Sequence, residues 1–163
     1  AGDFDLVKAA MVGMGAHMQF MGIKMKPGKP LALGVIGGTP AFGLPGNPVA
    51  AQVGFLQFVR PWIRSAMGCT SPFLPVIQAR LSATHTKKAG RAELSRVRLR
   101  WESECWSVLP NQNQSSGSPR SLADADGLML LNESAHDLQP GEWVHVQLIG
   151  STHRGQAEPG YPW

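Results

Sequence analysis

Two lysines lie three residues apart in the stretch Met25-Lys26-Pro27-Gly28-Lys29-Pro30. A proline directly follows each lysine, and proline cannot sit in the interior of a helix, so this stretch is a loop. A lysine ammonium is a compact point charge that pairs well with an oxyanion. Two solvated surface lysines are the alternative, but a solvated charge has no need of a stiffened loop. The pattern therefore indicates an anion-binding turn.

A second loop rich in proline and glycine follows at Gly43-Leu44-Pro45-Gly46-Asn47-Pro48. Pro48 suits the first turn of a helix, and Asn47 is a preferred N-cap residue. The unpaired amides and the dipole at a helix N-terminus attract anions. An ordinary strand-to-helix turn is the alternative, and the single glycine pair favours it. The loop is neither a Walker A loop nor a GxGxxG fingerprint, so the standard nucleotide motifs do not apply.

The second half of the chain offers an arginine and a serine-rich turn. Arg96 shares a face with Leu94 and Arg98 along a predicted strand, where most arginines are surface residues. The turn Gln114-Ser115-Ser116-Gly117 supplies hydroxyls and amides. No base adjoins these serines, so a serine nucleophile is not supported.

The remaining charged residues admit simpler interpretations. Asp3 and Asp5 could hold Mg²⁺ through oxygen, or could cap the helix that follows, and capping is favoured for Asp3. Lys87 and Lys88 lie in a predicted hairpin tip and are interpreted as solvated. The five histidines lack the spacing of metal ligands.

The elements that carry these residues change in kind near Gly68. Before it, helical spacing and short apolar runs alternate, which is typical of a layered α/β domain. After it, short strands are separated by polar turns, which predicts a small β-barrel or sandwich. Pro61 falls inside a predicted helix and should kink or split it. The expected elements are helices at 4–14 and 48–67 and strands at 17–24, 31–36, 40–44, 76–81, 93–101, 106–109, 128–131 and 143–149.

Charge and composition narrow the class of ligand. The net charge is +4, and the whole excess lies in residues 1–70. This local positive field favours an anionic ligand, but it is far from the dense basic stripe of a nucleic-acid binder. No apolar run approaches the ~18 residues that span a membrane. Two isolated cysteines fit neither a disulfide framework nor a CxxC site, so we expect a reducing, cytoplasmic location.

Six motifs then occur in a fixed order along the chain: Lys-Pro-Gly-Lys-Pro, Gly-Leu-Pro-Gly-Asn-Pro-Val, Gly-Arg-x-Glu-x-x-Arg, Gln-Ser-Ser, Asp-Gly-Leu and Pro-Gly-Glu-x-Val. In this order they resemble the C-terminal half of molybdopterin molybdenumtransferases, the family of bacterial MoeA and of the E domain of gephyrin. The resemblance implies part of a three-layer molybdopterin-binding α/β domain at residues 1–70 and a C-terminal β-barrel at 71–150. A flexible tail is expected at 151–163.

The resemblance also implies a reaction, in which molybdate is inserted into adenylylated molybdopterin and AMP is released with the help of Mg²⁺. By position in the motifs, catalytic roles fall to Asp5, Lys26 and Lys29, and Asp5 is also the implied metal ligand. The implied binding residues for molybdate and molybdopterin are Lys26, Lys29, Pro45, Gly46, Asn47, Pro48, Arg96 and Ser116. A tetrahedral dianion can be neutralised by two ammonium groups and a guanidinium.

The chain departs from the family in two respects. Ala50 stands where the family commonly has serine, so one hydroxyl contact is missing or replaced. Family members are much longer, and their sites are completed by other domains and by the second subunit of a homodimer. We therefore expect the chain to be a fragment with little or no insertase activity alone.

Two other classes of function stay open at this level. A non-catalytic molybdopterin-binding or gephyrin-like scaffold module would need a peptide groove near the barrel, and no motif marks one. A nucleic-acid binder would rest on Lys87, Lys88 and Arg91, and the zero net charge of residues 71–163 argues against it.

Overall fold

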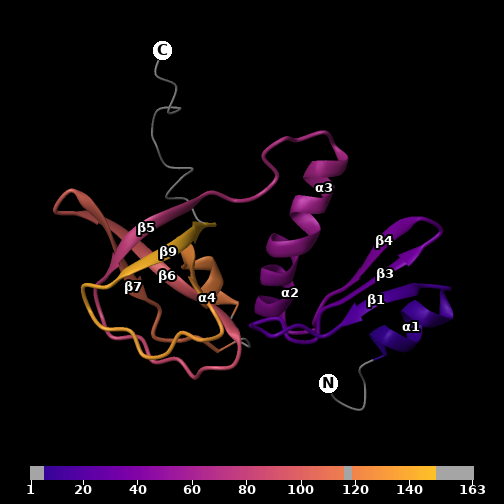
Figure 1. Ribbon diagram of the computed structural model, residues 1–163, viewed down its shortest axis with the longest axis horizontal. Helices are drawn as coiled ribbons and strands as arrows, with labels where there is room; N and C mark the ends of the chain where they lie inside the picture. Colours follow the sequence, from indigo (N-terminus) through magenta and orange to yellow (C-terminus); the bar gives the residue numbers. More distant parts are fainter. Residues whose placement is uncertain (1–5, 116–118, 150–163) are drawn as a thin grey trace. The chain divides into compact units, whose positions relative to one another are not determined.

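The computed structural model of the chain describes residues 6–115 and 119–149 (Figure 1). Within it the chain divides into two compact units, with the boundary between Phe73 and Leu74. The elements in chain order are α1 (Val7–Gly13), β1 (His17–Met21), β2 (Met25–Lys26), β3 (Ala32–Ile36), β4 (Thr39–Gly43), α2 (Pro48–Gly54), the π-helical segment η1 (Phe55–Val59), α3 (Arg60–Ala66), β5 (Val76–Leu81), β6 (Ala92–Glu102), β7 (Cys105–Pro110), α4 (Arg120–Ala123), β8 (Gly127–Leu131) and β9 (Trp143–Leu148). Among the described residues, no helix has the length and apolar character needed to cross a bilayer.

The first unit is mixed α/β. Strands β1, β3 and β4 form an antiparallel three-stranded sheet in the order β1-β3-β4. Gly37 and Gly38 form the tight turn between β3 and β4, and both take positive φ. A residue with a side chain would be strained in this backbone conformation, so glycine is favoured at both positions. The helical run that follows packs on this sheet through Trp62, whose ring centroid lies 6.2 Å from that of Phe42.

The helical run consists of α2, η1 and α3. Pro61 has no backbone N–H, so it cannot donate to the carbonyl four residues earlier. The chain widens into η1 just before this proline and resumes as α3 with Pro61 in its first turn. Gly54 and Arg60, at the two junctions, keep helical backbone angles, so the run continues through them. The predicted interruption at Pro61 is present as a change of helix type, and the run ends at Ala66.

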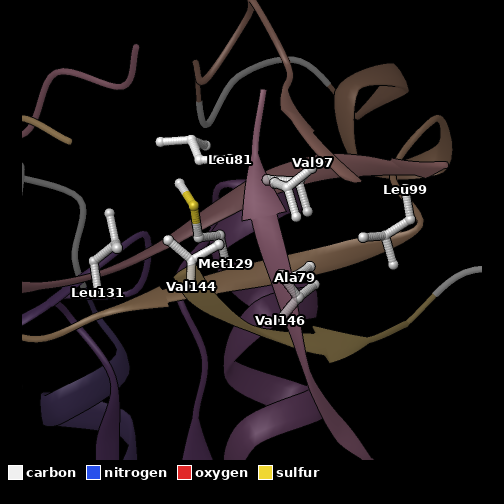
Figure 2. Packing of buried hydrophobic residues seen from close by; sticks show 9 residues of the cluster. Ala79, Leu81, Val97, Leu99, Met129, Leu131, Val144 and Val146 are labelled. Carbon is white, nitrogen blue, oxygen red and sulfur yellow. The ribbon is translucent and has the colours of Figure 1, made fainter. Parts of the chain in front are cut away.

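The second unit is a closed barrel of five strands. Neighbouring strands follow the order β6-β7-β5-β9-β8, and β8 pairs again with β6 to close the ring. All pairs are antiparallel except β5 with β7. Alternate side chains point inward and fill the interior (Figure 2), and burying each large aliphatic side chain contributes about 1.5–3 kcal/mol. The buried cluster consists of Ala79, Leu81, Val97, Leu99, Val108, Met129, Leu131, Val144 and Val146.

Several boundaries differ from the sequence expectation, and the two-residue strand β2, inside the stretch predicted as a loop, was not predicted. The first helix begins at Val7 with Leu6 at its N-cap, and the predicted cap Asp3 lies outside the described residues. The first strand ends at Met21, because Gly22 takes a φ of 85° and turns the chain. The short helix α4 was not predicted, since a single turn is too short to carry a periodic apolar pattern.

The sequence predicted that Lys87 is solvated in a hairpin tip, and this prediction is wrong. Its side chain is buried, with 4% of the residue exposed. The ammonium donates to the carbonyl of Ala135 at 2.9 Å and to those of Lys88 and Glu133 at 3.4 and 3.5 Å. Its backbone N–H donates to Asp137 Oδ1 at 3.0 Å. Lys87 therefore ties two loops of the barrel together, and only the neighbouring Lys88 is exposed as expected.

Candidate functional site

The lysine turn begins with the short strand β2 and continues through Pro30. Lys26 and Lys29 are exposed, while Pro27 and Gly28 between them are buried. The Ile23 N–H donates to the Lys29 carbonyl at 2.9 Å and so closes the turn. Gly28 has a φ of 117°, and a Cβ there would lie 2.6 Å from Met25 Cε. The turn is therefore fixed in shape, and it presents two ammonium groups from a buried base.

The second loop connects β4 to α2. Asn47 occupies the N-cap with extended backbone angles, φ −75° and ψ 123°, and its carbonyl accepts the Ala51 N–H at 2.8 Å. The predicted cap position is right, but the Asn47 side chain makes no capping hydrogen bond. Pro48 lies in the first turn of the helix, as predicted. Pro45 is half-buried, and Gly46 and Pro48 are exposed.

The register of the β3–β4 pair brings the two loops to one end of the sheet. Ala32 lies opposite Gly43, so the residues before Ala32 and after Gly43 leave the ladder side by side. Helix α2 holds both loop ends: a Cβ on Gly54 would lie 3.0 Å from Leu31 Cδ1 and 3.2 Å from Leu44 Cδ2. The lysine turn and the Pro45–Pro48 loop are thus neighbours within the first unit.

Arg96, in the second unit, is buried to an extent unusual for an arginine, with 1% of the residue exposed. Its Nη2 donates to the carbonyls of Asn113 and Ser115, both at 3.3 Å. Its Nε–H is buried and has no hydrogen-bond partner in the described part of the chain. The usual surface placement of such an arginine does not apply, because the side chain turns onto the 111–115 segment.

Among the residues that the structure describes, no ion pair joins Arg96 to a carboxylate. The ion pairs among the described residues of this unit join His85 with Glu93, and Asp124 with Arg98 and Arg120. Burial lowers the pKa of the Arg96 guanidinium, while the charge of Glu93 raises it. An arginine stays protonated even so. A buried cation with a spare N–H is a good partner for an oxyanion.

Two family descriptions match the chain. Residues 1–65 match "Probable molybdopterin binding domain", and residues 78–149 match "MoeA C-terminal region (domain IV)". Together they account for most of the chain. The chain belongs to the MoeA family.

Individual relatives agree with this MoeA assignment. The chain is 34% identical to molybdopterin molybdenumtransferase 2 of Mycobacterium tuberculosis, over 90% of this chain and 37% of that protein. It is 28% identical to molybdopterin molybdenumtransferase of Staphylococcus aureus, over 92% of this chain and 36% of the relative. A crystal structure of the molybdopterin biosynthesis MoeA protein from Pyrococcus horikosii aligns with a TM-score of 0.71 at 32% identity, covering 86% of this chain and 34% of that one. The chain thus spans little more than a third of the length of the curated relatives.

Not every residue expected from the MoeA motifs can be located. Asp5 and Ser116 lie outside the described residues. Among the described residues, no group of three or more His, Cys, Asp or Glu side chains could hold a metal ion. Ala50 is buried in α2.

Sequence reasoning assigned no role to Gln114, although it belongs to the Gln-Ser-Ser motif. In the structure its side-chain amide is hydrogen-bonded to the backbone of Arg96. The motif contained the residue, but residue spacing alone could not reveal a partner 18 positions away.

Proposed function

We propose that this chain is the molybdate-handling part of a molybdopterin molybdenumtransferase. The reaction inserts molybdate into adenylylated molybdopterin and releases AMP. The names of the curated relatives support this activity for the longer proteins, and the chain carries regions that match a probable molybdopterin binding domain and the MoeA C-terminal region. Molybdate is the substrate, and AMP is the leaving group.

The observation that carries the proposal is the state of Arg96. Its guanidinium is buried, holds two loop carbonyls, and keeps one buried N–H without a partner in the described residues. Leaving a buried donor unpaired costs about 1–3 kcal/mol, and more when the group is charged. A tetrahedral oxyanion would supply both the acceptor and the countercharge.

The lysine turn supports the same class of ligand. Lys26 and Lys29 are exposed at the ends of a buried Pro-Gly pair, so their charges are presented from a fixed backbone. We assign both lysines to molybdate binding and charge neutralisation. Fixing the oxyanion beside the dithiolene would contribute through proximity, because the reacting atoms are already oriented.

Further assignments extend the proposal. Ser116 is a further molybdate contact, Pro45, Gly46, Asn47 and Pro48 shape the binding loop, and Asp5 is a carboxylate ligand for Mg²⁺. When bound, Mg²⁺ would screen the phosphoanhydride that releases AMP. A homodimer of the full-length protein and a cytoplasmic location complete the proposal.

Calorimetry tests the proposed function. Molybdate is titrated into this chain and into the full-length Mycobacterium tuberculosis relative, with sulfate as a second tetrahedral dianion. We expect both proteins to bind molybdate more tightly than sulfate, and only the longer one to produce cofactor from adenylylated molybdopterin. Molybdate binding by the relative but not by this chain would overturn the assignment of the site to these residues, and equal affinity for sulfate would reduce it to a general anion site.

A further inference from the structure

Gln114 and Arg96 are joined by reciprocal hydrogen bonds. The backbone N–H of Arg96 donates to Gln114 Oε1 at 3.0 Å, and Gln114 Nε2 donates to the Arg96 carbonyl at 2.8 Å. A side-chain amide carries the same donor and acceptor as a peptide group. Gln114 therefore pairs with β6 as a residue of a neighbouring strand would.

The orientation of this amide is fixed by its surroundings. The second N–H of Gln114 Nε2 donates to the Asn111 carbonyl at 2.9 Å, and the Asn111 N–H donates to the Arg96 carbonyl at 2.9 Å. A flipped amide would set its NH₂ group against the Arg96 N–H and its oxygen against two carbonyls. Only one orientation satisfies all the partners, so the amide holds the 111–115 segment in one arrangement on β6.

The side chain of Arg96 holds the same segment through separate contacts. Its Nη2 donates to the carbonyls of Asn113 and Ser115, which flank Gln114. The backbone and the guanidinium of one residue are thus tied to one segment. Asn111 and Asn113 also line an open cavity of about 400 Å³ together with Arg98 and Asp124, and Arg96 is not among its lining residues.

We propose that Gln114 is a positioning residue for the oxyanion site. It does not contact the ligand; it fixes the 111–115 segment, and through the segment's carbonyls it fixes the direction of the spare Nε–H of Arg96. This inference rests on the proposed function, because the ligand that the Nε–H would meet is the molybdate assigned there.

The test compares Gln114→Leu with Gln78→Leu in the full chain. Gln78 is exposed on β5, so its replacement controls for the loss of an amide without touching the segment. Amide hydrogen exchange followed by NMR measures how well the backbone amides of Arg96 and the 111–115 segment are protected. Calorimetry measures the affinity for molybdate. For Gln114→Leu we expect the Arg96 amide to exchange about tenfold faster, because its acceptor is lost. We also expect molybdate affinity to fall about tenfold, the loss expected for a hydrogen bond to a charged group. Gln78→Leu should change neither.

A second variant keeps the test decisive if Gln114→Leu does not fold. Gln114→Glu retains the acceptor for the Arg96 N–H but replaces both donations by repulsion between oxygens. It should leave the Arg96 amide protected, speed exchange at Asn111, and still weaken molybdate binding.

The outcomes separate the two claims. Wild-type exchange rates in both Gln114 variants would overturn the positioning role, and so would faster exchange with unchanged molybdate affinity. Absence of molybdate binding in the wild-type chain would instead overturn the proposed function, and the positioning role would fall with it. Faster exchange together with weaker binding, both absent from Gln78→Leu, supports the inference.

Discussion

A Cβ atom on Gly43 would lie 2.5 Å from Val7 Cγ1, closer than side chains approach in folded proteins. The same Cβ would lie 3.1 Å from the Cβ of Ala32, its partner in the ladder, and 3.2 Å from Met11 Sδ. Gly43 is therefore where α1 closes onto the sheet. It is also the strand end from which the Pro45–Pro48 loop leaves, so packing of α1 and placement of this loop depend on one position.

Gly43→Ala should destabilise the first unit. The new methyl group must displace Val7 and Met11, and overpacking of this kind costs about 1–3 kcal/mol. Urea unfolding, followed by a signal from Trp62 in the first unit, measures the change in the free energy of unfolding. Gly13→Ala is the matched control, because a Cβ there meets nothing within 4 Å. Equal stability of the two variants would show that α1 does not close onto β4 as described.

Lys26→Ala and Lys29→Ala should each weaken molybdate binding by about tenfold or more, since a hydrogen bond to a charged group contributes about 1.5–3 kcal/mol. The loss should shrink as salt is added, because exposed charges are screened. Calorimetric titration at two ionic strengths measures both effects. Lys24→Ala removes an exposed lysine just before the turn and should have a much smaller effect. If all three variants lose affinity equally, only the general positive field of residues 1–70 attracts the anion.

Lys87→Met should destabilise the barrel by about 1–3 kcal/mol, because it removes the buried ammonium that donates to the part-buried carbonyl of Ala135. Methionine keeps most of the length of the side chain, so the loss of stability measures the hydrogen bonds of the ammonium and not the packing of the aliphatic part. Thermal unfolding of the barrel provides the measurement. Lys88→Met is the control, since Lys88 is exposed. A stability equal to that of the control would mean that the ammonium leaves its carbonyls at little cost in solution.

The parts of this structure that follow local rules were predictable from the sequence. Apolar alternation gave β5 its observed bounds, because the barrel interior selects every second side chain. Proline and glycine marked both loops of the first unit, because these residues restrict or free the backbone wherever they occur. The placement of Pro48 at a helix start is of the same kind.

The parts that depend on distant partners were not predictable. Arg96 and Lys87 were both interpreted as surface residues, yet each is buried because backbone carbonyls far along the chain accept hydrogen bonds from its charged group. The partners lie 17 and 19 residues from Arg96, and 46 and 48 residues from Lys87. Every residue has a backbone carbonyl, so the sequence does not indicate which carbonyls a charged side chain will contact. Whether such a side chain is buried is known only from the fold.

Cys69 should react with alkylating reagents at a lower pH than an ordinary thiol. The backbone N–H of Ser71 lowers the pKa of Cys69, assisted by Arg64, whose Nη2 donates to the sulfur at 3.0 Å, while partial burial opposes the shift. A lowered pKa means that more thiolate is present at a given pH, so the alkylation rate should reach half its plateau at a lower pH. The measurement is the rate of iodoacetamide labelling against pH in a Cys105→Ser background. Adding Arg64→Ala should move the midpoint upward, whereas Arg80→Ala, a change in the barrel, should leave it in place. A midpoint unchanged by Arg64→Ala would leave the Ser71 amide and the charge of Arg60 as the causes of the lowered pKa.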